Sequence, residues 1–183
     1  MQNAIGHVDF SFTSSLRPWD DDPEEYWIEV TGKIMVLPDD APDEADPEPA
    51  GEIQMELVRV AEAENDNVSL CAVFDSTEAL NQIYCALFDK REEVKADLDL
   101  EPFVHEVLYI HTLKLEPRYG NTSLGVQAIQ TAASAFVTMG IVVADADLNL
   151  SLDDWKNLGF VRIAGERGFY VWEKIKENPY DRK

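Results

Sequence analysis

The segment from Glu116 to Ile129 reads EPRYGNTSLGVQAI, and it connects two stretches of different hydrophobic periodicity. The preceding stretch, Val104–Leu115, contains the alternating run VLYIHTLKL, which predicts a strand. In the following stretch, apolar side chains recur at helical spacing to about Met139. Asn121 or Thr122 is the expected N-cap of this helix. The segment is therefore a short polar turn from a strand into a helix.

A turn of this kind can bind an anion through its main chain. The first N–H groups of a helix have no intrahelical acceptor, and the helix dipole adds a partial positive charge there. Small side chains let a phosphate approach these groups. The small or polar residues of the turn are Gly120, Asn121, Thr122, Ser123 and Gly125. Strand-to-helix turns are common and most bind nothing, so the neighbouring elements are needed to choose between a phosphate site and a plain connection.

The elements predicted after the turn favour the phosphate site. The long helix is followed by a short apolar strand at Ile141–Ala146 and by a short helix with Ser151 as its N-cap. That helix contains the motif WKNLGF, Trp155–Phe160. Two closing strands, GFVRIAG and GFYVWEKI, are predicted on either side of a Gly-Glu-Arg-Gly turn.

This order of elements, over about residues 104–175, resembles the GNAT superfamily of acetyl-coenzyme A-dependent N-acyltransferases. The pyrophosphate loop of that family commonly reads P-x-Y-R-G-x-G-x-G after a strand. The segment LKLEPRYGNTSLG can be laid on it without a gap, and Pro117, Tyr119 and Gly125 match the proline, the tyrosine and the last glycine. WKNLGF resembles the Y-x-K-x-G-F signature near the end of the family's domain.

The chain also departs from the family pattern. The loop arginine falls on Gly120, and two loop glycines fall on Asn121 and Ser123. A shift of two residues brings Arg118 near the arginine position but breaks the match of the glycines. Many members have a tyrosine that acts as general acid at the position of Trp155, and an indole N–H cannot protonate a leaving thiolate as a phenol does.

The resemblance implies an α+β fold with a mixed, mostly antiparallel central sheet flanked by helices, in a single domain spanning residues 1–183. It also implies acetyl-CoA as cosubstrate. The central strand would part from its neighbour and pair with the pantetheine arm, and a backbone N–H would polarise the thioester carbonyl. The residues implied to bind the coenzyme are Leu113, Leu115, Gly120, Asn121, Thr122, Ser123, Leu124 and Gly125.

Transfer to an amine also requires a base that removes the acceptor's proton. Glu106 and His111, on the predicted central strand, are the candidate catalytic residues, and His105 beside them is a further candidate. Asp145 and Asp147 follow the short apolar strand, where they either bind the acceptor amine or serve as turn residues.

The N-terminal half differs from the family. Predicted strands at residues 26–37 and 52–63 flank an acidic, proline-rich stretch at about 38–51, which we expect to be a flexible loop. VSLCAVF, Val68–Phe74, is predicted as a third strand. A helix is predicted from Ser76, with a polar continuation that ends at Pro102.

Composition limits the partners. The net charge of −21 would repel nucleic acid, so we expect no nucleic-acid partner. No apolar run approaches a membrane span, and no signal peptide or zinc-ligand spacing is recognised, so we expect a cytoplasmic protein without membrane or metal sites. Cys71 and Cys85 are expected to be buried free thiols.

Two functions remain open. The first is an N-acyltransferase acting on an amine-bearing small molecule or a basic protein. The second is a catalytically inactive protein of the same fold, which engages a basic partner through its acidic surface. A homodimer is one assembly that we consider for either.

Overall fold

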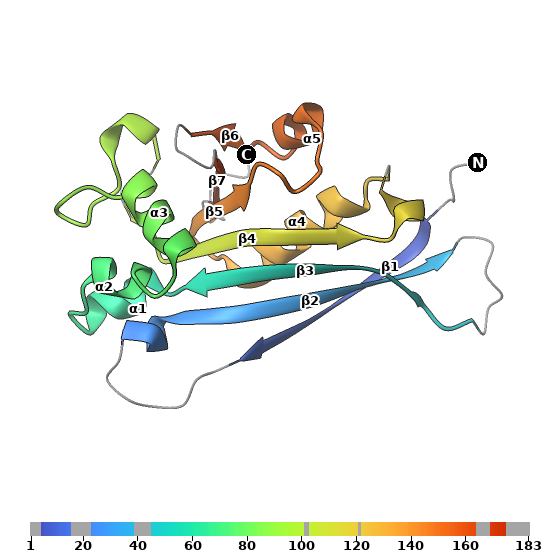
Figure 1. Cartoon of the computed structure of the whole chain (residues 1–183), viewed down its shortest axis with the longest axis horizontal. Helices are drawn as coiled ribbons and strands as arrows, with labels where there is room; N and C mark the ends of the chain where they lie inside the picture. The colour runs from blue at the N-terminus through green and yellow to red at the C-terminus, as the bar shows by residue number, and fades with distance from the viewer. Residues whose placement is uncertain are drawn as a thin grey trace, which may run out of the picture.

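The computed structural model describes residues 5–15, 23–38, 45–100, 103–120, 122–163 and 169–174. They form a seven-stranded sheet in the order β1-β2-β3-β4-β5-β7-β6, with helices on both faces (Figure 1). Neighbouring strands are antiparallel except for β4 and β5, which are parallel. The expected α+β class, with a mixed and mostly antiparallel sheet, is therefore confirmed.

The strands are β1 (Ile5–Ser15), β2 (Trp27–Pro38), β3 (Glu48–Val58), β4 (Glu106–Leu115), β5 (Gly140–Asp145), β6 (Val161–Arg162) and β7 (Phe169–Lys174). All except β1 coincide with or overlap strands predicted from the sequence. The strand that was not predicted, β1, nevertheless shows period-two alternation. Its alternate residues Val8, Phe10 and Phe12 all pack against the core.

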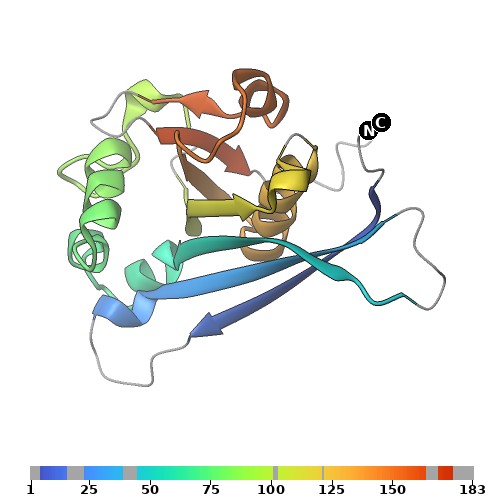
Figure 2. The ribbon, with the colours of Figure 1, turned by 45° about the vertical axis from the view of Figure 1, so that its right-hand side comes forward.

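The helices are α1 (Val60–Asn65), α2 (Leu70–Phe74), α3 (Glu78–Leu87), α4 (Leu124–Phe136) and α5 (Leu152–Asn157), with 3₁₀ turns η1 (Pro23–Tyr26), η2 (Ala96–Leu98) and η3 (Pro117–Tyr119). Helices α1–α3 pack on one side of the sheet, here called the α3 face, and α4 and α5 pack on the other, the α4 face (Figure 2). Each face has its own apolar core. The large fully buried side chains include Trp155 on the α4 face and Phe74 on the α3 face.

The predicted strand at Val68–Phe74 is wrong, because this run contains α2. The carboxylate of Glu92 accepts hydrogen bonds from the N–H groups of Leu70 (2.9 Å) and Cys71 (3.2 Å) and so satisfies the first turn. A short apolar run does not distinguish a strand from a buried helix, and here a distant side chain decides between them. Both cysteines are free but exposed, not buried as expected.

Other predicted boundaries also shift. Helix α3 is capped by Thr77, whose hydroxyl accepts from the N–H of Leu80, and it ends at Leu87. The described part of the polar continuation contains no α-helix: Val94 forms an isolated β-bridge with Phe88, and the 3₁₀ turn η2 follows.

The boundary of the acidic loop shifts as well. Its expected range of 38–51 is too long, because β3 already begins at Glu48. Residues 39–44 of that range lie outside the described part of the chain. Strand β3 pairs with both β2 and β4 over most of its length, which explains why an acidic stretch ends in regular structure.

Helix α4 ends at Phe136, earlier than the predicted end near Met139, and Gly140 is the first residue of β5. It pairs with Glu106 at the beginning of the parallel β4–β5 ladder. A Cβ atom at Gly140 would lie 2.0 Å from the carbonyl oxygen of Glu106, so only glycine allows the two strands to approach here. This close pair holds β4 and β5 together at one end, while the other end carries the candidate site.

Candidate functional site

Strand β4 continues beyond its pairing with β5. The parallel ladder runs from Glu106–Gly140 to Ile110–Ala144 and stops, although β4 reaches Leu115. On its other side, β4 stays paired with β3 as far as Leu115. The last part of β4, from His111 to Leu115, therefore presents one main-chain edge that β5 does not cover. The expected parting of the central strand from its neighbour is confirmed.

A β-bulge lies where the strands part. In the β3–β4 ladder Gln54 is opposite Thr112 and Met55 is opposite Ile110, so His111 is an extra residue on β4. A bulge bends its strand and changes the direction of the side chain that it carries. The bulge therefore accounts both for the divergence of β4 and for the placement of His111 beside the open edge.

The turn after β4 leads into α4 with unpaired N–H groups. Ser123 is the N-cap residue, and its side chain makes no cap hydrogen bond. Within the described residues, no acceptor is found for the N–H groups of Ser123, Gly125 and Val126. The N–H of Leu124 has only a long bond of 3.3 Å to the hydroxyl of Thr122. The first turn of α4 can therefore donate hydrogen bonds to an anion.

Two of these residues, Ser123 and Gly125, line a pocket of about 650 Å³, here called the β4–α4 pocket. It lies between the free end of β4, the turn and first residues of α4, and the segment that leads into α5. Its lining residues are Leu113, Lys114, Leu115, Gly120, Thr122, Ser123, Gly125, Leu148, Asn149, Leu150, Ser151 and Asp154.

Six of the eight residues that the sequence predicted to bind the coenzyme line this pocket. Leu113, Leu115, Gly120, Thr122, Ser123 and Gly125 line it. The side chain of Leu124 is buried in the core, and Asn121 lies outside the described residues. The wall at residues 148–151 was not predicted. Its signal in the sequence was the capping box Ser151–Asp154, which starts α5 at the rim.

On the α3 face, three polar side chains gather where β4 and β5 part, those of Tyr109, His111 and Asp145. The hydroxyl of Tyr109 donates to Oδ2 of Asp145 at 2.9 Å, and Asp145 is the last residue of β5. The rings of Tyr109 and His111 lie 5.6 Å apart. Nδ1 of His111 is 3.1 Å from the hydroxyl oxygen of Thr112. The sequence had suggested His111 and Asp145 individually, and the structure brings them together.

The environment of His111 favours the neutral imidazole. Burial lowers the pKa of His111 below its usual value, and the carboxylates of Asp145 and Glu29 offset part of this effect. A neutral imidazole can accept a proton at neutral pH.

Glu56 is a further carboxyl group on this face that the sequence analysis did not single out. On β3 it lies opposite Tyr109 on one side and opposite Glu29 of β2 on the other. Its Oε2 atom is buried and has no hydrogen-bond partner among the described residues. Burial and the repulsion from Glu29 raise the pKa of Glu56 to about 7, although a hydrogen bond from Thr77 acts in the opposite direction.

The other predicted catalytic residue, Glu106, lies elsewhere. It is the first residue of β4, at the end away from the pocket. Its carboxylate accepts hydrogen bonds from the N–H and hydroxyl of Thr138 and from the N–H of Met139. It thereby binds the turn between α4 and β5. The structure does not bring Glu106 together with His111.

Trp155 belongs to the core of the α4 face. It is 1% exposed, and its ring stacks on Tyr170 with centroids 4.4 Å apart and planes at 9°. Phe160 packs against it edge-on at 5.2 Å. The residue that stands at the family's tyrosine position is therefore a packing residue here.

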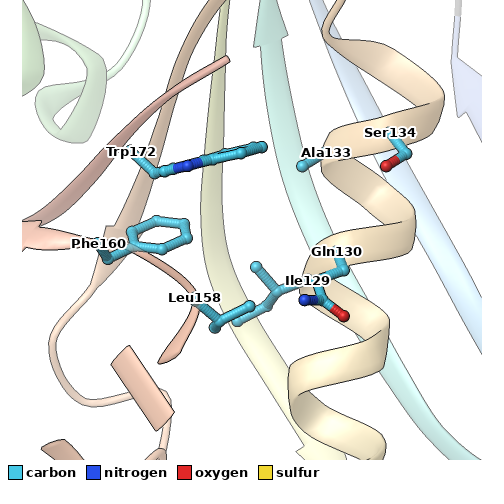
Figure 3. A pocket seen from close by; sticks show the side chains of 7 residues that line it. All are labelled: Ile129, Gln130, Ala133, Ser134, Leu158, Phe160 and Trp172. Carbon is cyan, nitrogen blue, oxygen red and sulfur yellow. The ribbon is translucent and has the colours of Figure 1, made fainter. Parts of the chain in front are cut away.

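A second hollow of about 370 Å³ lies on the α4 face (Figure 3). The rings of Phe160 and Trp172 form one side, α4 forms the other, and Leu158 lies between them (Figure 3). None of its lining residues belongs to the β4–α4 pocket.

No family model and no curated protein matches the chain. Two solved structures of Arabidopsis thaliana NAA60 are similar to it at 12% sequence identity. The complex with a bisubstrate analogue gives a TM-score of 0.39 and covers 82% of this chain and 76% of that chain. The complex with acetyl-CoA gives a TM-score of 0.40 and covers 79% and 76%. At this level of similarity, function has to be argued from the geometry of the chain itself.

Two further observations concern the described part of the chain. None of its helices has the length and apolar character needed to cross a membrane. It contains no group of three or more His, Cys, Asp or Glu side chains arranged to hold a metal ion.

Proposed function

We propose that the protein transfers an acyl group from acetyl-CoA to an amine. One observation carries the proposal. The uncovered edge of β4 at Leu113–Leu115 and the first turn of α4 at Ser123 and Gly125, whose N–H groups have no acceptor among the described residues, line the same pocket. A strand edge suits an extended amide-bearing chain, and a helix start suits a phosphate. Acetyl-CoA combines both features in one molecule.

The coenzyme would be held mainly by main-chain groups. The diphosphate would accept hydrogen bonds from the N–H groups of Ser123 and Gly125, which line the pocket. The pantetheine arm would pair with the free edge of β4. Gly125 supports this placement, because a Cβ atom there would lie 3.2 Å from Leu113 and 3.1 Å from Leu150, two residues of the pocket wall. A larger residue would therefore press on both sides of the pocket.

The transfer would take place where β4 and β5 part. The acceptor nitrogen attacks the thioester carbonyl, the C–N bond forms, the C–S bond breaks, and the thiolate leaves. A main-chain N–H near Leu113 would stabilise the developing oxyanion. His111 would accept the proton that the acceptor ammonium loses, since its imidazole is neutral at pH 7. Glu106 has no part in this proposal, because its carboxylate binds the Thr138 turn.

The acceptor would be an amine-bearing small molecule or a basic protein. Glu29, Glu56 and Asp145 lie on the same face as His111 and would attract a cation. The net charge of −21 acts in the same direction over a longer range.

Calorimetric titration with acetyl-CoA tests the coenzyme site. We expect saturable binding to the native protein and at least a ~10-fold loss of affinity for Ser123→Trp, because the indole would cover the N–H groups. The control is Ser134→Trp, which places the same side chain on an exposed position of α4 outside the pocket. Equal affinity of the Ser123→Trp variant and the control would rule out the assignment of the loop.

Thiol release from acetyl-CoA in the presence of a polyamine tests turnover. For His111→Gln we expect kcat to fall by about 10²-fold, with little change in KM for acetyl-CoA, because only proton removal is affected. Native kcat/KM should decline on the acid side only below the ordinary histidine pKa. If the protein binds acetyl-CoA but releases no thiol from it in the presence of any amine tested, it is a coenzyme-binding protein without this activity.

The second candidate function is a catalytically inactive interaction protein of the same fold. The observation that favours it is the buried stack of Trp155 on Tyr170, which places no phenol at the family's acid position. Such a protein would engage a basic partner through its acidic surface. Affinity for a polylysine probe should then fall steeply from low to high salt, and a salt-independent affinity would contradict it.

A further inference from the structure

The loop that presents the N–H groups is attached to the beginning of β3. After β4, the N–H of Glu116 donates to the carbonyl of Ala50 at 2.8 Å. Two further bonds join the loop to Glu48, the first residue of β3. The end of the acidic stretch, which the proposed function leaves without a role, therefore holds the loop.

The carboxylate of Glu48 binds two adjacent loop residues through one oxygen atom. Oε1 accepts from the hydroxyl of Tyr119 at 2.7 Å, and Nη1 of Arg118 lies 2.8 Å from the same atom. The Arg118 guanidinium also lies over the Tyr119 ring, 4.9 Å from its centroid. Hydrogen bonds to a charged acceptor are stronger than those between neutral groups.

Tyr119 transmits this attachment to the core. Its side chain is 2% exposed and packs in the core of the α4 face. Burial and the bond to Glu48 raise the pKa of Tyr119, so its hydroxyl remains a donor across the physiological range. The carbonyl of Tyr119 in turn accepts from the N–H and the hydroxyl of Thr122, at 3.1 and 2.7 Å, directly before the N-cap of α4.

Arg118 is paired in this arrangement and is absent from the lining of the β4–α4 pocket. Arg118 is the basic residue nearest the arginine position of the family's loop pattern, and its charge is balanced by the carboxylate of Glu48. An anion in the pocket would then meet the ammonium group of Lys114 and the main-chain N–H groups at the start of α4, and the placement of the N–H groups depends on the loop.

We propose that Glu48 is a positioning residue, which holds the Arg118–Thr122 loop so that the first N–H groups of α4 face the pocket. The inference rests on the proposed function for the identity of the ligand, but its structural part does not depend on it. Glu48 would act through Tyr119 and Arg118, not by contact with the ligand.

Four variants test this proposal. Glu48→Ala removes both bonds, Glu48→Gln keeps an acceptor for Tyr119 but removes the ion pair, and Tyr119→Phe removes only the hydroxyl. Glu52→Gln is the control, since it removes one negative charge from the same strand, and its carboxylate is bonded to Gln54 rather than to the loop. The two measurements are acetyl-CoA affinity and hydrogen exchange of the Tyr119 and Thr122 amides without ligand.

For Glu48→Ala we expect acetyl-CoA to bind about 10-fold more weakly, with smaller losses of about 3-fold for Glu48→Gln and Tyr119→Phe and none for Glu52→Gln. Where turnover is measurable, KM should rise while kcat stays within about 2-fold. Exchange of the Thr122 amide should become faster by a similar factor. If Glu48→Ala does not fold, Glu48→Gln and Tyr119→Phe decide.

Native-like affinity and native-like exchange in the folded variants would overturn the proposal. If native protein fails to bind acetyl-CoA but exchange accelerates in Glu48→Ala, the proposed function falls and the positioning role stands. If native protein binds acetyl-CoA and no Glu48 variant changes the affinity or the exchange rate, the proposed function stands and the positioning role falls.

Discussion

The carboxyl group of Glu56 lies in the middle of a sheet between Glu29 and Tyr109. A buried carboxylate loses hydration, and a second carboxylate beside it adds repulsion. Both effects raise the pKa of Glu56 to about 7. A group that opposes folding when charged, yet lies opposite Tyr109 on the face that carries His111, is typical of a functional site.

Glu56→Gln is expected to stabilise the protein at alkaline pH. Because the folded state binds the Glu56 proton more tightly than the unfolded state, the free energy of unfolding falls as pH rises from about 4.5 to about 7. The variant should be more stable than native protein by about 1–2 kcal/mol at pH 8, which allows for the partial exposure of the side chain. At pH 4 the difference should vanish.

Urea denaturation of both proteins at pH 4 and 8 measures this difference. Glu52→Gln on the same strand is the control, and it should show no comparable gain at pH 8. A Glu56→Gln variant that is less stable than native protein at pH 8 would show that the carboxylate is satisfied in the folded state.

Among the secondary-structure elements, the parallel pair β4–β5 determines the site. Gly140 allows the strands to approach at one end, and the bulge at His111 turns β4 away at the other. Helix α4 connects the two strands and begins at the pocket. The opening is therefore a consequence of how two adjacent elements begin and end.

Gly140→Ala is expected to destabilise the protein by at least ~2 kcal/mol, because a Cβ atom would lie 2.0 Å from the Glu106 carbonyl oxygen and the backbone has to move. Thermal unfolding gives the measurement. Gly120→Ala is the matched control, since its Cβ would meet nothing closer than Pro117 O at 3.6 Å. If Gly140→Ala lowers the stability no more than Gly120→Ala does, the strands can move apart at Gly140 at no measurable cost in free energy.

The site residues differ in how far the sequence could predict them. Leu113, Ser123 and Gly125 lie within one continuous strand–turn–helix segment, so the resemblance of that segment to a known loop was sufficient to place them side by side. The role of Glu106 was misjudged, because its partner Thr138 is 32 residues away in the chain. Glu56 gave no signal, since nothing in its own strand distinguishes it from Glu52.

The molecule as a whole carries a net charge of −21. Such an excess lowers stability by self-repulsion, and dissolved ions screen it over distances beyond about 10 Å at 0.1 M salt. The described part of the chain has few ion pairs to compensate, among them Arg59–Glu62 and Arg118–Glu48.

Added sodium chloride is therefore expected to raise the melting temperature by several degrees. Most of the rise should occur below about 0.15 M, because screening saturates there. Differential scanning fluorimetry from ~10 mM to ~500 mM salt gives the curve. A strictly linear rise would indicate a general salt effect on hydration instead, and a flat curve would show that the carboxylates are far enough apart not to repel.

Local chain chemistry was enough to predict the strand at 104–115, the turn, the helix that follows and the capped helix at Ser151. The two helices form their hydrogen bonds between near neighbours, and the side-chain periodicity of all these elements can be read directly from the sequence. The acidic character of the surface also follows from composition alone. Contacts between distant segments decided the rest: Glu92 satisfies the first turn of the helix Leu70–Phe74, and pairing with β2 made Glu48 part of a strand. Those contacts depend on which segments meet after collapse, and no single segment contains that information.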